Sequence, residues 1–353
     1  VTSSVKSPSG LRLKTFAYEN FQGLDTSRDV TSLDTGKDQH LTVVDNATCD
    51  WRGQIVRDPA HKFLEGQHPV NHIAFFNKDE IVYVEEDGAA LNFKSERGHK
   101  LTGVYGKNDI VTSGIFNQMA FFAVRGQPVY RYDGIVFSSN QSPALNELRP
   151  AYMASVQRRL AVAGIPGRET EVHLSRVDQD EIFPDDEADD ETNVLRAGFF
   201  DIANNLGTAD QITGLGSFEQ NQLVIFTMDR ALIFKIDPDF TRWTINDNAN
   251  IHIGCVSHNT IVNAGTDLLF CSRSGIHSIK RSEENGILVY SYSLSDKIDL
   301  LYRELFNSVE DPEKISAVFD QDEGQYHVFF PQSGDLITRR LTLALNPEGG
   351  EAQ

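Results

Sequence analysis

The stretch Ser217–Phe234, SFEQNQLVIFTMDRALIF, contains the pattern that decides the fold. Its first residues end one apolar strand, and the polar turn Glu219–Gln222 leads into a second apolar strand, Leu223–Phe226. A turn at Asp229-Arg230 then precedes a third apolar run, Ala231–Phe234. Short apolar runs separated by polar turns are typical of antiparallel strands. We therefore expect this stretch to form neighbouring strands of one sheet.

The same layout recurs, weakly but in order, along most of the chain. His72–Val84 has two apolar strands around a polar turn, and Val318–Ile337 repeats the pattern near the C-terminus. A unit of roughly 40 residues built from short strands is the sequence signature of a propeller blade. The sequence thus predicts an all-β fold, a β-propeller of about six blades. The six units begin at His72, Gly114, Tyr152, Ile212, Val256 and Ser316.

The spacing of the units also divides the chain into segments. Residues 1–40 are polar and turn-rich and are expected to form an N-terminal arm. The propeller is expected over residues 41–345, followed by a C-terminal tail at 346–353. The third and fifth intervals between units are longer than the others by roughly 20 residues. The sequence therefore predicts insertions at about 178–205 and 282–314.

The first insertion is strongly acidic. Carboxylates are the ligands that hard cations prefer, but the regular D-x-D-x-D-G spacing of a calcium loop is missing. The charge and Pro184 exclude a core strand. We predict a solvated surface loop, with a divalent-cation site as the less favoured alternative. Its acidic residues are Asp178, Asp180, Glu181, Asp185, Asp186, Glu187, Asp189, Asp190 and Glu191.

The second insertion contains the best helix pattern in the chain, an apolar stripe at spacings of three and four residues. Ser295 is expected to cap the N-terminus of this helix, and Asp296 suits the positive end of the helix dipole. Such a helix must bury its stripe either against a blade or against another subunit. The stripe consists of Ile298, Leu301, Tyr302 and Leu305.

Composition excludes several classes of protein. The 32 basic residues against 51 acidic ones give a net charge of −19, which argues against tight, sequence-independent binding of nucleic acid. No apolar run approaches the roughly 18 residues of a membrane span, and no signal peptide is visible, so we expect no membrane anchor. Hydrophobic residues at 40% and charged residues at 24% are ordinary for a globular protein, so the composition is compatible with the predicted propeller.

Candidate chemical sites are weak. His252, Cys255 and His258 have zinc-like spacing, but in a strand residues three apart point to opposite faces, so we expect no metal. Cys255 and Cys271 could face each other, yet free buried thiols are favoured.

A glycosidase would need paired carboxylates, and the candidate acids are explained by turn geometry alone. Neither a G-x-S-x-G elbow nor a Walker loop is present, so neither a catalytic residue nor a cofactor is expected. The candidate acids are Asp133, Asp229, Asp267 and Asp320.

Several motifs, in shared order, resemble a family of phage virion proteins, the β-propeller tail proteins that include the nozzle or distal tail-tube proteins of short-tailed phages. The opening resembles the family's F-x-G-L-N-T-x-D pattern, and later passages resemble R-G-x-[IL]-x-[RK], R-L-x-V-A-G, D-x-I-T-G-L and a closing G-I with L-S-x-x-I. These motifs are Asn20–Thr26 with Asp29, Leu33 and Gly36; Trp51–Arg57; Arg159–Gly164; Asp210–Leu215; and Gly275-Ile276 with Leu294–Ile298.

The resemblance implies a structural tail part without catalytic residues, located in the virion and assembled in the host cytoplasm. Such proteins form a ring, commonly a homo-hexamer, around the channel through which DNA leaves, with adjacent tail or adaptor proteins as partners. An acidic lumen would let DNA pass transiently without sticking. Two alternatives stay open, another propeller adaptor of the virion and a glycan-binding or glycan-cleaving tail propeller. The expected assembly interface combines arm and helix residues, Leu11, Leu13, Phe16, Phe21, Ile298, Leu301, Tyr302 and Leu305.

Overall fold

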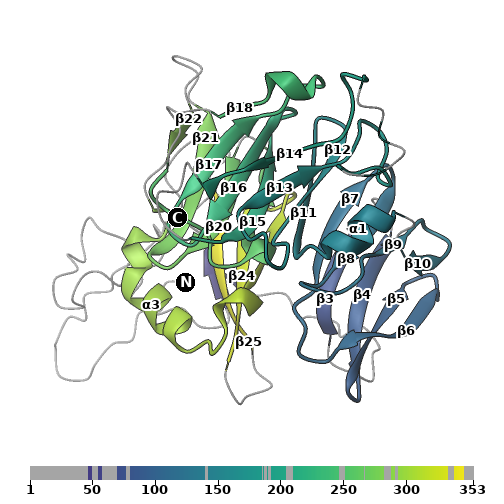
Figure 1. The fold of residues 1–353 in the computed structure, drawn as a ribbon. Helices are drawn as coiled ribbons and strands as arrows, with labels where there is room; N and C mark the ends of the chain where they lie inside the picture. The colour runs from purple at the N-terminus through teal and green to yellow at the C-terminus, as the bar shows by residue number, and fades with distance from the viewer. Residues whose placement is uncertain are drawn as a thin grey trace, which may run out of the picture.

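Among the residues that the computed structural model describes there are 25 strands and several short helices, and six antiparallel sheets of these strands are arranged as a β-propeller (Figure 1). The predicted arm at 1–40 and tail at 346–353 lie outside the described residues. Within the described part of the chain, no helix is long and apolar enough to cross a bilayer. The structure describes residues 47–49, 55–57, 70–76, 80–139, 142–184, 186, 189, 192–203, 210–245, 251–265, 267–281, 288–290, 293–332 and 338–345.

Within the described residues, each of the first five sheets has four strands in chain order, and the sixth has three. Blades 1 to 3 contain β3 (Val70–Phe76), β4 (Glu80–Asp87), β5 (Ala90–Ser95) and β6 (Lys100–Gly106); β7 (Thr112–Phe116), β8 (Met119–Ala123), β9 (Tyr130–Tyr132) and β10 (Phe137–Ser139); and β11 (Tyr152–Val156), β12 (Arg159–Ala163), β13 (Glu171–Leu174) and β14 (Gly198–Asp201). Blades 4 to 6 contain β15 (Ile212–Phe218), β16 (Gln222–Thr227), β17 (Ala231–Lys235) and β18 (Thr244–Ile245); β19 (Val262–Asn263), β20 (Asp267–Ser272), β21 (Gly275–Arg281) and β22 (Leu288–Tyr290); and β23 (Ser316–Asp320), β24 (Gln325–Pro331) and β25 (Thr338–Ala344). A separate hairpin joins β1 (Ala47–Cys49) and β2 (Ile55–Arg57).

The predicted six blades are confirmed, and five of the six predicted unit starts fall in the first strand of a blade. The fifth start is wrong. Val256 lies in a long connection between β18 and β19, which contains the 3-10 turn η4 (His258–Thr260). The connection is not a strand because its backbone bonds go elsewhere, with Cys255 N–H donating to the Thr227 carbonyl at 3.0 Å.

Apolar residues from consecutive blades interdigitate between the sheets. Five clusters of buried side chains fill, in turn, the spaces from blades 1 and 2 through blades 5 and 6. Every second residue of a strand faces one side of its sheet, so a blade can supply one cluster with each face. In β16, for instance, Leu223 and Ile225 join the blade 3–4 cluster, while Val224 and Phe226 join the blade 4–5 cluster.

Antiparallel order decides which connections share a face of the ring. Turns between the first and second strands and between the third and fourth strands lie on one face, which we call the insertion face. Connections between blades lie on the opposite face, which we call the connector face. The acidic insertion, residues 175–197 between β13 and β14, is therefore on the insertion face.

The helical segment connects β22 to β23 on the connector face and contains η5 (Asp296–Ile298), α3 (Asp299–Asn307) and η6 (Pro312–Lys314). Ser295 occupies the predicted N-cap position, at the start of η5, but the expected capping bond is wrong. Its hydroxyl makes no capping bond and instead accepts from the Ile276 N–H at 3.0 Å, which ties the segment to blade 5. A second helix, α1 (Pro143–Leu148), connects blades 2 and 3 and is capped by Ser142.

Candidate functional site

The acidic insertion is fixed to the propeller rather than freely solvated. Phe183 is fully buried in the cluster between blades 2 and 3, and Asp180 is only 7% exposed. The prediction of a solvated surface loop is therefore wrong for this part of the insertion, because one apolar side chain anchors it. Asp185, Glu187, Asp190 and Glu191 lie outside the described residues.

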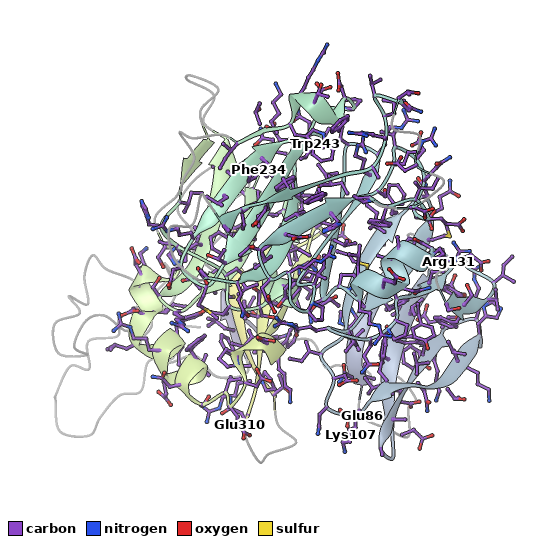
Figure 2. All side chains as sticks on the ribbon, viewed as in Figure 1. Glu86, Lys107, Arg131, Phe234, Trp243 and Glu310 are labelled. Atoms are coloured by element: carbon purple, nitrogen blue, oxygen red, sulfur yellow. The ribbon has the colours of Figure 1, made fainter. Side chains whose placement is uncertain are left out.

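Arginines from two blades neutralise the beginning of the insertion. Arg131 of β9 lies 3.2 Å from Asp180 and 2.9 Å from Glu181 (Figure 2 labels Arg131). Arg158, in the β11–β12 turn, pairs with Asp178. Burial raises the pKa of Asp180, and Arg131 opposes that rise. The insertion thus joins blades 2 and 3 through ion pairs as well as through Phe183.

The end of the insertion is held by Arg159, the first residue of β12, whose side chain is fully buried. One terminal nitrogen donates to the carbonyls of Ser175 and Arg196, each at 2.7 Å. The other donates to the carbonyls of Leu195 at 3.3 Å and Pro238 at 2.7 Å. These carbonyls belong to the two ends of the insertion and to the β17–β18 connection of blade 4.

Electrostatics at Arg159 are unusual for a buried cation. Among the described residues, no carboxylate forms a hydrogen bond with its guanidinium, although Asp189 attracts it through space. The guanidinium also lies 5.2 Å from the ring of Trp243, a favourable cation–π contact (Figure 2 labels Trp243). Burial lowers the pKa of Arg159 to about 10. It remains charged at neutral pH and joins three segments of backbone at one point.

The predicted helix stripe packs within the chain. Ile298, Tyr302 and Leu305 are buried in the cluster between blades 5 and 6, and the Tyr302 hydroxyl donates to the Ser272 carbonyl at 2.6 Å. Of the two alternatives for the stripe, the structure shows burial against blades of the same chain. Leu301 is partly buried against that cluster, whereas Leu300 is 64% exposed.

A neighbouring subunit could therefore contact Leu300, but it could reach the three buried side chains only by opening the core. The interface prediction for those three is corrected accordingly. The other predicted interface residues, Leu11, Leu13, Phe16 and Phe21, lie outside the described residues.

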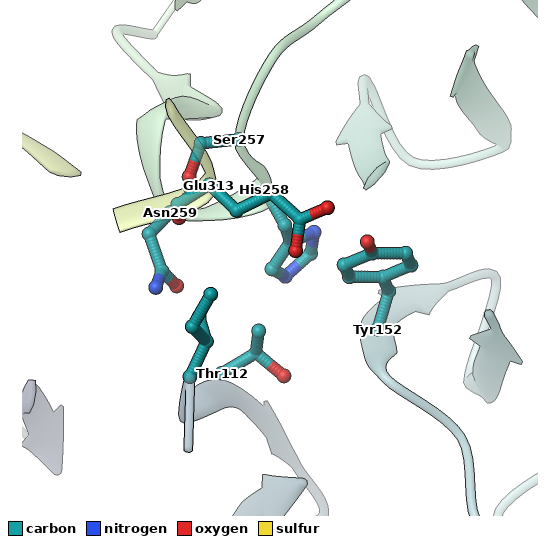
Figure 3. Close-up of a pocket in the computed structure, with 7 residues that line it drawn as sticks. Thr112, Tyr152, Ser257, His258, Asn259 and Glu313 are labelled. Atoms are coloured by element: carbon teal, nitrogen blue, oxygen red, sulfur yellow. Dashed lines mark hydrogen bonds between the residues drawn. The ribbon is translucent and has the colours of Figure 1, made fainter. Parts of the chain in front are cut away.

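A second constellation, which sequence reasoning missed, lies where the innermost strands meet on the connector face. We call it the axial junction. It receives side chains from β3, β7, β11, the β18–β19 connection and η6, and Figure 3 shows Tyr152, His258 and Glu313 among them. The space that it leaves has a volume of about 10 Å³, close to the minimum that holds one water molecule. Its members are His72, Ser113, Tyr152, His258, Asn259 and Glu313.

Hydrogen bonds across the axial junction link blades that are far apart in sequence. His72 Nε2 lies 2.8 Å from the Ser113 hydroxyl, which joins blades 1 and 2. Asn259 donates to the carbonyl of Val111 at 3.1 Å and so reaches from the connection before blade 5 to blade 2. The Ser257 hydroxyl is 2.7 Å from the Glu313 carbonyl, which ties the same connection to η6 before blade 6.

His258 occupies the middle of the axial junction. The backbone N–H of Leu215 donates to its Nδ1 at 3.2 Å, and the Tyr152 ring lies 5.3 Å from its ring. Burial lowers the pKa of His258 to about 4, and His72 adds to this effect by electrostatic repulsion. Burial also lowers the pKa of His72 to about 4. Both rings are therefore neutral near pH 7.

The zinc-like pattern does not converge in space. His252 is exposed, whereas Cys255 is buried and its Sγ lies 3.1 Å from the Ser257 carbonyl. In the part of the chain that the structure describes, no group of three or more His, Cys, Asp or Glu residues is placed to hold a metal ion. No sequence signal pointed to the axial junction, because its members come from five separate segments.

Comparisons with known proteins add similarity of fold alone. No protein-family model matches the chain, and no curated protein matches it by sequence. Raptor of Chaetomium thermophilum is 12% identical with a TM-score of 0.47, over 80% of this chain and 24% of that one. Hsv2 of Kluyveromyces lactis is 11% identical with a TM-score of 0.46, over 84% of this chain and 87% of that one. Virginiamycin B lyase of Staphylococcus aureus is 13% identical with a TM-score of 0.41, over 80% of this chain and 83% of that one. None of these three is a phage tail protein, so the resemblance drawn from the motifs stays a prediction.

Proposed function

We propose that this protein is a structural, non-enzymatic component of a bacteriophage tail. In this proposal it assembles as a homo-oligomeric ring, a hexamer by the motif resemblance, around the channel through which DNA leaves. Neighbouring tail or adaptor proteins are then its partners, and the virion is its location. The proposal rests on the ordered sequence motifs and on one structural observation, the firm attachment of the acidic insertion.

A loop that must present charge at a defined place in an assembly needs a rigid base. The acidic insertion has such a base in Phe183, Arg131 and Arg159, which hold it to blades 2, 3 and 4. Its exposed carboxylates, Asp178 and Glu181, therefore stand in fixed positions on the insertion face, although arginines neutralise part of their charge. Fixed negative charge repels DNA phosphates at short range, which suits passage without binding.

The connector face supports a structural role in a different way. The mouth of the propeller axis, where small ligands could enter, is filled by the chain's own Tyr152, His258 and Glu313 (Figure 3). Space for about one water molecule does not admit a sugar or nucleotide. A DNA channel would accordingly be formed between subunits and not through the axis of one propeller.

The mass of the purified chain in solution tests the proposal directly. Light scattering is expected to give a ring-sized multiple of the 39.4 kDa chain, and negative-stain images are expected to show rings with a central hole. A variant with Leu300→Glu, an exposed position on the helical segment, would show whether that surface takes part. A clean monomer at all concentrations, together with specific binding on a sugar array, would overturn the proposal in favour of a glycan-binding propeller.

A further inference from the structure

The axial junction unites parts of the chain that would otherwise be held only by contacts between adjacent blades. His72 comes from blade 1, Tyr152 from blade 3 and His258 from the connection between blades 4 and 5. The N–H that His258 accepts belongs to Leu215 of blade 4. A change at the His258 ring therefore affects contacts with three blades, 1, 3 and 4.

The hydrogen bond from Leu215 dictates the protonation state of His258. A backbone N–H can donate to Nδ1 only when that nitrogen carries no proton. Protonated imidazole has donors at both nitrogens, so the Leu215 N–H would then face another N–H. The bond would be lost, and a positive charge would appear in a space that holds at most about one water molecule.

The groups around His258 leave this charge poorly compensated. From β3 it faces His72, whose own protonation would repel it, and from β11 it faces the neutral phenol of Tyr152. From η6 it faces Glu313, the one acid in the junction, and Arg125 in the β8–β9 connection competes for that carboxylate. The neighbouring thiol of Cys255 stays protonated because burial raises its pKa to about 11.

We propose that His72 and His258 form a proton-operated latch on the propeller axis. With both rings neutral, the connection at residues 251–261 is fastened to blades 2, 4 and 6. Protonation of His258 breaks the bond from the Leu215 N–H and weakens the attachment of this connection to blade 4, and a charge on His72 adds electrostatic repulsion. Because β18 and β19 flank the connection, its release loosens the contact between blades 4 and 5 on the connector face. The inference concerns a single chain and does not depend on the proposed ring.

The size of the effect follows from the titration of one ring. A histidine that titrates near 6.5 when exposed and at about 4 in the junction favours the opened state by about 20-fold at pH 5 relative to pH 7. Below pH 4 the factor approaches about 300-fold for each ring. Openings that expose both rings are favoured by the product of the two factors.

Hydrogen exchange at the Leu215 amide tests the latch in the intact protein. After correction for the intrinsic pH dependence, protection of this amide is expected to fall by about 20-fold between pH 7 and pH 5. His258→Asn, whose side-chain oxygen can still accept from Leu215 but cannot titrate, is expected to remove most of this fall. His252→Gln changes an exposed ring in the same connection and is expected to leave it unchanged.

Titration of the imidazole signals by NMR gives an independent measurement on the unmodified chain, so the test survives a variant that fails to fold. A His258 signal that titrates near 6.5 would refute the latch. The same conclusion would follow if His258→Asn and the unmodified protein lost protection at Leu215 equally. A fall in protection that is spread evenly over all blades would instead indicate global acid unfolding and would also overturn the inference.

Discussion

Replacement of Arg159 by methionine should release the acidic insertion and destabilise the protein. Methionine keeps the apolar stem in its packed position but removes all four donated hydrogen bonds. The Leu195 carbonyl retains a bond from the Val177 N–H at 3.3 Å, whereas the carbonyls of Ser175 and Pro238 lose the hydrogen bond that the structure shows for them. Each buried carbonyl left without a donor costs about 1–3 kcal/mol.

The gain from no longer burying a guanidinium offsets part of this loss. We expect a net decrease of about 3 kcal/mol in the free energy of unfolding, a large share of the 5–15 kcal/mol that is typical of folded domains. The matched control is the neighbouring residue. Arg158→Met removes an ion pair with Asp178 at a side chain that is 72% exposed, and exposed pairs contribute little.

Urea unfolding of both variants, followed by fluorescence and circular dichroism, measures the difference. Limited proteolysis adds a local readout, because Arg159→Met should be cut within residues 175–197 at a lower protease concentration than Arg158→Met. If the two variants have equal unfolding free energies and equal cleavage patterns, the assigned role of Arg159 is wrong. Arg159→Lys should lie between the two, since an ammonium cannot reach carbonyls of three segments in a planar fork.

Three further predictions concern other buried groups. Burial lowers the pKa of His277 to about 4, so its contribution to stability is present above pH 6.5 and is lost as the pH falls toward 4. The decrease in unfolding free energy from pH 7 to pH 5 should therefore be about 2 kcal/mol smaller in His277→Asn than in the unmodified protein. Burial raises the pKa of the Cys255 thiol to about 11 and that of Cys271 to about 12, so both thiols should resist a thiol reagent at pH 8 until the protein unfolds. The number of thiols that react is compared with the number in a variant that lacks both cysteines. Fast reaction of these two thiols in the native protein would contradict the prediction. A Cβ at Gly254 would overlap the Thr227 carbonyl oxygen, so Gly254→Ala should abolish folding or displace the connection. The control is Gly167→Ala, in open space but at a φ of +79°. It should lower the free energy of unfolding, measured by heat or urea, by about 1 kcal/mol.

The sequence was sufficient for the architecture because each blade is specified locally. Apolar runs such as Leu223–Phe226 and Ala231–Phe234 form adjacent strands with the register that their turn imposes. The predicted unit start at Val256 is wrong because distant partners bind the backbone of the connection. The Thr227 carbonyl accepts from Cys255, and Ala231 forms a β-bridge with Ile251. Periodicity contains no information about such partners.

The candidate sites were less accessible to sequence reasoning, again because their contacts are distant in the chain. The acidic run was visible, but the single phenylalanine at 183 that anchors it looked like any other loop residue. Arg159 lies in the R-L-x-V-A-G motif, yet its burial depends on the carbonyls of Arg196 and Pro238. His258 was noticed as part of a metal-like pattern, although its partners are Leu215 and the rings of blades 1 and 3.

Polar side chains hold a connecting segment on each face of the propeller, a charged one on the insertion face and a neutral one on the connector face. On the insertion face, a permanent cation at Arg159 holds backbone that would otherwise move, and no pH in the ordinary range can discharge it. On the connector face, His258 accepts the Leu215 N–H only while its Nδ1 carries no proton. Acid should therefore loosen the connector face and leave the insertion attached. Exchange measured at Leu215 and at Val177, whose amide donates to the Leu195 carbonyl, would show this order directly, and simultaneous loss of protection at both sites would mean that the faces do not act independently.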